Sequence, residues 1–188
     1  SSVDLGSPVT DDNCGVDNVE NDSQGFYTVG DNTVTWTVTD IYGNTATAVQ
    51  IVTITDDEAP SIEAPTAVQV SADANACQAT SVDIGTASVS DNCAVDSVSN
   101  DAPATFPIGT TTVTWTVVDI HGNSAQTTQD VTVVDDVLPL ITAPSDTTVS
   151  TDAGTCEATV DIGSPVTSDN CSVDLVTNDA PASFPVGQ

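Results

Sequence analysis

Two kinds of residue in this chain could do chemistry: aspartates, which could bind a cation, and cysteines, which could form disulfides. The 188 residues include 28 Asp and Glu, one His and no Lys or Arg, so the formal net charge is −28. Except through the histidine or the chain terminus, no salt bridge can form. The carboxylates must therefore be balanced by water, salt or bound cations.

The aspartates recur at fixed intervals along the chain. Asp-Asn-Cys begins at residues 12, 91 and 169, and Asp56-Asp57 returns one interval later as Asp135-Asp136. Adjacent carboxylates with carbonyl and Asn oxygens nearby suit Ca²⁺, which takes about six to eight oxygen ligands. The sequence therefore predicts Ca²⁺ at the junctions between repeats. The candidate ligands are Asp12, Asp40, Asn44, Asp56, Asp57, Asp91, Asp119, Asn123, Asp135, Asp136 and Asp169.

Apolar and loop positions recur together with these acids. Val34–Val38 returns as Val113–Val117, and Asp40–Asn44 returns as Asp119–Asn123, with the same spacing. Repetition of both kinds of position indicates that whole domains are copied in tandem. We expect residues 1–57 to be the C-terminal part of one repeat, 58–136 a complete repeat and 137–188 the N-terminal part of a third. The segment is thus expected to come from a longer series.

Within a repeat, apolar and polar residues alternate. In Val113-Thr114-Trp115-Thr116-Val117 the valines and the tryptophan fall on one face and the threonines on the other, as in a strand with one buried face. Similar β-branched runs are bounded by Asp, Asn, Gly and Pro, and no window has helical spacing. The pattern predicts an all-β fold of tandem immunoglobulin-like antiparallel β-sandwich repeats of about 79 residues, with Trp36 and Trp115 in the cores.

The turn Asp119-Ile120-His121-Gly122-Asn123 allows two interpretations. An odd number of strands per repeat would bring it to the incoming linker, so that Asp56 and Asp57 approach Asp119 and Asn123 around an ion. Alternatively, Asp40 and Asp119 accept hydrogen bonds from their own turns and bind no metal. A seven-stranded count puts the Asp-Asn-Cys loop at the incoming end of the sandwich, whereas a bond from Cys93 back to Cys77 would pull it toward the outgoing end, so which end carries the loop stays open.

Several motifs in fixed order resemble a known family. Cys77, Ser90–Cys93, Phe106–Thr110, Val113–Trp115 and Asp119–Asn123 occur in the order seen in the hyalin repeat, an immunoglobulin-like module of extracellular adhesion proteins. The resemblance extends over the whole chain. It implies a stalk or adhesive repeat outside the cell and implies no catalytic activity.

The resemblance also bears on the cysteines. The family often has two further cysteines, whose places here hold Ala64 and Ala143, and Ala48 and Thr127. Cys77 and Cys156 each precede an Asp-Asn-Cys cysteine, by 16 and 15 residues, and the joint absence of the further cysteines supports pairing them. We therefore expect bonds between Cys77 and Cys93 and between Cys156 and Cys171, which leaves the partner of Cys14 before residue 1. Reduced, buried cysteines are the alternative. Oxidised bonds would place the protein in an extracellular or periplasmic space, and with the resemblance the expected location is extracellular or at the cell surface.

Other functions find little support. Nucleic-acid binding and polybasic membrane attachment need Lys or Arg, and no apolar run is long enough to span a membrane. His121 is replaced by Tyr42 in the previous repeat, so we expect an exposed turn residue and no enzyme. The prediction is a structural repeat of an extracellular fibre or stalk, stiffened by calcium and disulfides. Its expected partners are copies of itself or further repeats; the alternative is an adhesin that binds a surface glycan or protein.

Overall fold

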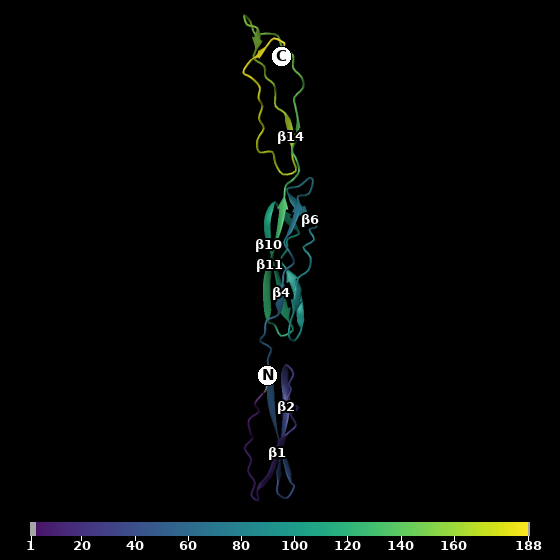
Figure 1. The fold of residues 1–188 in the computed structure, drawn as a ribbon, viewed down its shortest axis with the longest axis vertical. Helices are drawn as coiled ribbons and strands as arrows, with labels where there is room; N and C mark the ends of the chain where they lie inside the picture. Colours follow the sequence, from purple (N-terminus) through teal and green to yellow (C-terminus); the bar gives the residue numbers. More distant parts are fainter. Residues whose placement is uncertain (1–2, 188) are drawn as a thin grey trace. The chain divides into compact units, whose positions relative to one another are not determined.

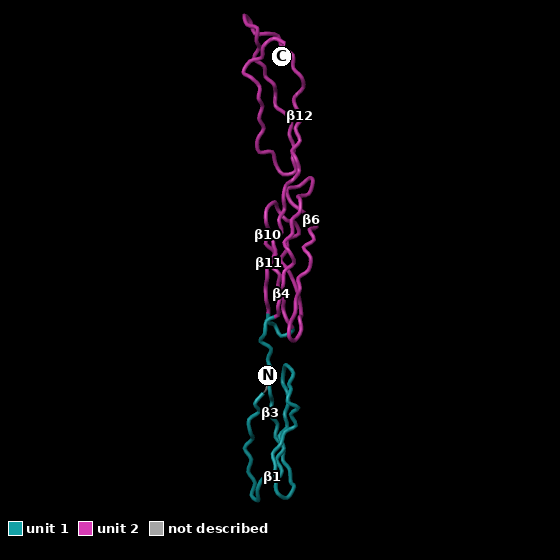
Figure 2. The backbone as a smooth tube through the Cα atoms, in the orientation of Figure 1, with its two compact units in different colours: residues 1–59, 120–123 teal, residues 60–119, 124–188 magenta. Residues whose placement is uncertain are grey.

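The fold is that of a computed structural model, which describes residues 3–187. Only β-strands, and no helices, occur in those residues, so the prediction of an all-β fold is confirmed. The chain divides into two compact units (Figure 2): one contains the chain up to Ala59 and the turn Ile120–Asn123, and the other contains Pro60–Asp119 and the chain from Ser124 onward. The predicted domain boundaries after residues 57 and 136 stay predictions.

The first unit contains one antiparallel sheet in the order β1-β2-β3 (Figure 1). Its strands are β1 (Val16–Asn21), β2 (Gly30–Asp40) and β3 (Thr45–Ile54). The alternating run in β2 buries Val34 on one face, and Trp36 there is half-buried opposite Ala48. The turn from β2 to β3 needs Gly43, whose φ of 87° is a conformation that L side chains avoid.

The second unit holds the remaining strands. They are β4 (Ser61–Glu63), β5 (Val68–Ser71), β6 (Gln78–Thr80), β7 (Ser88–Ser90), β8 (Val95–Asn100), β9 (Thr105–Pro107), β10 (Gly109–Asp119), β11 (Ser124–Val134), β12 (Leu140–Thr142), β13 (Glu157–Ala158), β14 (Val166–Ser168) and β15 (Phe184–Pro185). One sheet has the order β5-β11-β10-β8, with β5 parallel to β11, and the other strands form the pairs β4-β7, β6-β9, β12-β14 and β13-β15.

A core lies where β4 and β9 pack against β10 and β11. It contains Val113, Trp115, Val131, Val133 and Phe106, all 5% exposed or less. The valines and Trp115 alternate with polar residues along β10 and β11, so the pattern read from the sequence does place one face of each strand inside. Residues 137–187 contain a groove of about 550 Å³. Its lining includes Val149, Ala158, Ile162 and Phe184, which are the equivalents, one repeat later, of residues in or next to this core.

Strand pairing fixes which loops share an end of the sandwich. Ser61 at the start of β4 pairs with Ser90, and Asp119 at the end of β10 pairs with Val95, so the Asp-Asn-Cys loop between β7 and β8 lies at the incoming end. At the other end, Gln78 pairs with Pro107, beside the start of β10. The 11 residues of β10 span about 35 Å between these ends.

A buried glutamine, which was not predicted from the sequence, links the two layers by hydrogen bonds. Gln129 is 3% exposed and accepts a hydrogen bond from the Trp115 indole N–H at 3.1 Å. Its amide nitrogen donates to the carbonyls of Thr66 and Ile84, both at 2.9 Å. Gln129 shares its strand face with Val131 and Val133. A polar residue at a core-facing position of the strand could therefore have indicated this buried hydrogen-bonding role.

Replacing this glutamine tests its structural role. Gln129→Leu keeps an apolar body but leaves one indole N–H and two carbonyls without their partner, so the free energy of unfolding should fall by about 2–3 kcal/mol. Denaturant unfolding measures it. The matched control is Gln126→Leu, on the same strand but exposed, which should change stability by less than about 0.5 kcal/mol. Equal losses in both variants would contradict the role given to Gln129.

Candidate functional site

Each Asp-Asn-Cys loop is shaped by its own aspartate. One oxygen of Asp91 accepts hydrogen bonds from the backbone N–H groups of Cys93 and Ala94, at 2.8 and 2.9 Å. Asp12 and Asp169 make the same pair of contacts in their loops, at 2.8 to 3.2 Å. The three loops therefore hold the cysteine backbone in the same way.

Asp91 also presents an oxygen that its own loop does not use. This Oδ1 atom is buried and has no hydrogen-bond partner in the described part of the chain. A ligand oxygen of Asp119, a residue only 2% exposed, lies within 4.8 Å of a carboxylate oxygen of Asp91. Burying a carboxylate oxygen without a donor or a cation is costly, so this pair suits a bound cation.

The turn after β2 matches the alternative interpretation, in which the aspartate caps its own turn. Asp40 Oδ1 accepts from the backbone N–H groups of Tyr42 and Asn44, both at 2.8 Å, and Oδ2 accepts from the Asn44 side chain at 2.7 Å. The Asn44 side-chain hydrogen bond, followed by these backbone bonds, lowers the pKa of Asp40 from its ordinary value of 3.8. Both carboxylate oxygens of Asp40 are thus occupied within the turn.

The equivalent turn at residues 120–123 contacts the linker. The Asn123 side chain donates to the backbone carbonyl of Asp56 at 2.9 Å, the approach that strand parity predicts. His121 Nδ1 lies 3.1 Å from Asp56 Oδ2, in the one kind of side-chain ion pair that the composition allows. The carboxylate of Asp56 is 3% exposed there, whereas the next residue, Asp57, is exposed. His121 is exposed, as predicted, whereas its contact with Asp56 was not predicted from the sequence.

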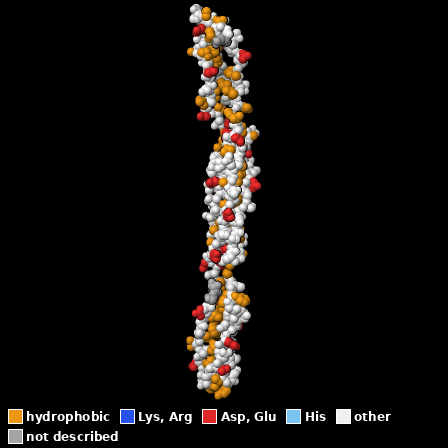
Figure 3. All heavy atoms as spheres, viewed as in Figure 1, with side chains coloured by type: hydrophobic (Ala, Val, Ile, Leu, Met, Phe, Trp, Pro, Cys, Tyr) orange, Lys and Arg blue, Asp and Glu red, His pale blue; other side chains and the backbone are white. Residues whose placement is uncertain are grey.

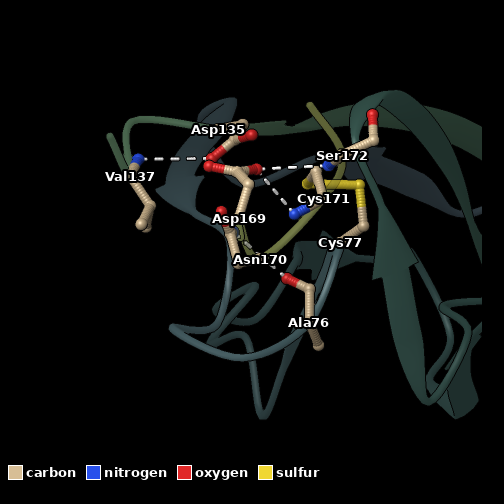
Figure 4. Close-up of a disulfide and its surroundings, with 8 residues drawn as sticks. All are labelled: Ala76, Cys77, Asp135, Val137, Asp169, Asn170, Cys171 and Ser172. Carbon is tan, nitrogen blue, oxygen red and sulfur yellow. Dashed lines mark hydrogen bonds between the residues drawn. A yellow bond between two sulfur atoms is a disulfide. The ribbon is translucent and has the colours of Figure 1, made fainter. Parts of the chain in front are cut away.

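A second acidic cluster lies after β11, around Asn170 (Figure 4). The Asn170 amide lies 3.5 Å from the carbonyl of Ala76. With its nitrogen turned to the other side, it donates to Asp135 and Asp169 at 3.2 and 3.3 Å, the better arrangement because both acceptors are carboxylates. The neighbouring Asp136 accepts from the Ser71 hydroxyl at 2.6 Å. Asp135, Asp136 and Asp169 are therefore held by local hydrogen bonds.

A disulfide beside this cluster joins Cys77 to Cys171, with Cα atoms 4.5 Å apart and a sequence separation of 94 (Figure 4). The predicted bonds between Cys77 and Cys93 and between Cys156 and Cys171 are therefore wrong. Cys77 precedes β6 at the outgoing end of the sandwich, whereas Cys93 follows β7 at the incoming end. The length of β10 separates these ends by far more than the limit of about 7 Å that a disulfide sets between Cα atoms.

Other candidate residues from the sequence take no part in this disulfide. Cys14 and Cys156 are exposed thiols, and Asp12 lies in the loop of Cys14. Carboxylates are scattered over the visible face of the molecule without any Lys or Arg beside them (Figure 3). None of the described residues forms a helix long and apolar enough to cross a membrane.

Comparison with known proteins identifies related sequences. Residues 55–133 match the model of the HYR domain family. The chain is also 30% identical over 174 residues to hyalin of Strongylocentrotus purpuratus, an alignment that covers 87% of this chain and 14% of hyalin. The chain thus spans about one seventh of the length of that relative.

The capped turn makes a prediction about Asp40. Asn44→Ala removes the side-chain hydrogen bond to its carboxylate, so the pKa of Asp40 should rise, as measured by NMR titration of the carboxyl carbon. Because the folded pKa is lowered, the stabilisation by Asp40 exists above the unfolded pKa of about 3.9 and is lost as the pH falls through the folded pKa. Asn13→Ala, in another loop, is the control. An unchanged pKa in Asn44→Ala would contradict the capped turn.

Proposed function

Because residues 55–133 are a domain of the HYR family, an immunoglobulin-like module, we propose that this chain is part of an extracellular fibre or cell-surface stalk. Its role is mechanical: repeats joined in series span a distance. No catalytic activity is assigned to it. Further repeats of the same chain, or copies of it, are the proposed partners. An exported location agrees with the disulfide, since such bonds persist in oxidising compartments.

The observation that carries this proposal is the bond from Cys77 to Cys171. These cysteines come from two successive sequence periods, 58–136 and 137–188, so the bond links one period to the next. A disulfide that served one folded domain would close within a period. Under the chain-entropy account, a closed loop of about 90 residues stabilises by roughly 4–5 kcal/mol. A covalent bond across the junction suits a chain that carries tension.

We also propose that Ca²⁺ binds beside Asp91 and Asp119. Two oxygen ligands of one Ca²⁺ lie no more than about 5 Å apart, and the two carboxylates meet this limit at 4.8 Å or less. The buried Oδ1 of Asp91 supplies a ligand atom with no competing donor. When bound, the ion would neutralise charge that the sequence cannot neutralise with Lys or Arg.

Asp56, Asp57 and Asn123 are the further ligands proposed from sequence. In the turn after β10, the Asn123 side chain contacts the backbone carbonyl of Asp56. Asp135, Asp136 and Asp169 correspond, one repeat later, to Asp56, Asp57 and Asp91. At Asp40 and Asn44 the capped turn favours no ion, because both oxygens of Asp40 already accept hydrogen bonds.

An adhesin that binds a surface glycan or protein remains the second candidate. The observation that favours it is the similarity to hyalin together with exposed apolar side chains such as Leu140, Val166 and Leu175. The fibre is preferred because the disulfide joins successive repeats. A screen against extracellular glycans and matrix proteins separates the two: specific binding would favour the adhesin.

The calcium proposal is tested on the whole chain by calorimetry and thermal unfolding. At free Ca²⁺ of about 100 times Kd, the free energy of unfolding should rise by about 2.7 kcal/mol and a chelator should reverse it. Asp91→Asn and Asp119→Asn should each weaken Ca²⁺ binding at least tenfold.

The matched control is Asp96→Asn, which removes an exposed carboxylate near the same loop. It should leave Ca²⁺ affinity within about twofold, because an exposed carboxylate that does not coordinate the ion is screened by water and salt. The site is refuted if Ca²⁺ changes neither heat nor melting temperature, or if Asp96→Asn lowers affinity as much as Asp91→Asn.

A further inference from the structure

The loop that carries Cys156 is built like the loop that carries Cys77. Before β6, the N–H of Asp73 donates to the carbonyl of Gln78 at 2.8 Å; before β13, Asp152 donates to Glu157 at the same distance. Ala79 pairs with Phe106 in β6 and β9, and Ala158 pairs with Phe184 in β13 and β15. Cys156 is therefore presented in the backbone conformation of a cysteine that is bonded, although its own thiol is exposed.

The receiving loop is likewise preformed. The aspartate that bonds the two N–H groups after it holds the loop of Cys14 as it holds the loop of Cys171. Cys171 is in a disulfide and Cys14 is an exposed thiol, so the loop keeps one shape in both states. Neither half of the bond has to be remodelled before the sulfurs meet.

We propose that the bond from Cys77 to Cys171 is one link of a series in which each repeat is bonded to the next. The rule is that the cysteine before the strand equivalent to β6 bonds the Asp-Asn-Cys cysteine of the following repeat. Cys156 is then the site for the Asp-Asn-Cys loop of a further copy of this module. Cys14 and Cys93 receive the corresponding cysteine of preceding repeats.

The bond forms by thiol–disulfide exchange with a low-molecular-weight disulfide such as oxidised glutathione. The Cys156 thiolate attacks one sulfur of the oxidant, whose S–S bond breaks, and a mixed disulfide and one thiol result. The Asp-Asn-Cys thiolate of the next repeat then attacks the Cys156 sulfur and releases the second thiol. Two cysteine thiols lose two protons and two electrons, and one oxidant disulfide gains them.

The series gives the chain a short covalent path under tension. From one bond to the next, the backbone runs only from Cys93 back to Cys77, 16 positions, or from Cys171 back to Cys156, 15 positions. Fully extended, such a segment spans about 50–60 Å, whereas a whole period of about 79 residues spans about 270 Å. An unfolded repeat would therefore span about five times less along the fibre when the bonds are intact.

The test lengthens the full chain in register and maps its disulfides. Residues 111–188 are appended once after Gln188, which aligns with Thr110, so the added residues continue the period. The added copy carries Ser172→Thr, which gives its cysteine peptide a distinct mass. After refolding with a glutathione couple, exposed thiols are alkylated and the unreduced protein is cleaved before Asp for mass spectrometry.

The expected result is two bonds: Cys77 with the first Cys171, and Cys156 with the added copy of Cys171. In a Cys156→Ser version, the added copy of Cys171 should become alkylated while the bond of Cys77 remains. Alkylated Cys156, or Cys156 bonded to Cys171 of its own repeat, would overturn the proposal. So would absence of the bond from Cys77, since the rule is taken from it. If the bond from Cys77 forms and only the bond from Cys156 is missing, this inference fails while the fibre and its calcium stand; absence of both bonds would also remove the support for the fibre.

Discussion

The structure depends on a constraint of strand geometry: the two cysteines of a period lie at opposite ends of one sandwich. β10 runs the full length between them, about 35 Å, so neither cysteine can reach the other. Each can meet a partner only in a neighbouring period. The bond from Cys77 to Cys171 follows directly, and so does the idea that the covalent structure runs along the series of repeats and does not close within each one.

Charge is the second constraint, and the molecule handles it locally. Without Lys or Arg, several aspartates accept hydrogen bonds from backbone N–H groups two to four residues ahead, as at Asp12, Asp40 and Asp169. Asp91 is different because its loop uses one oxygen and leaves the other buried beside Asp119. An aspartate thus shapes a turn in one place and suits a cation in another, and the difference is the burial of the second carboxylate oxygen.

The alternation in Val113–Val117, the Gly-containing turns and the repeat period were enough to predict an all-β fold, because these depend on local patterning. The cysteine pairing was predicted wrongly, since the closeness of Cys77 and Cys93 in sequence hides which end of the sheet each loop occupies. Strand parity had already raised this conflict, and only the register of β4 with β7 decides it. The role of Gln129 was not predicted, because its side chain bonds the carbonyls of Thr66 and Ile84, which are far from it in sequence.

Stretching single molecules by their termini in oxidising and reducing buffer tests the junction bond most directly. The bond from Cys77 to Cys171 removes 94 residues from the extensible chain, so the oxidised protein should reach a final length roughly 300 Å shorter than the reduced protein. Bonds within a period would remove only about 50 Å each. A difference of that smaller size, or none, would contradict the account of repeats joined covalently across their junctions.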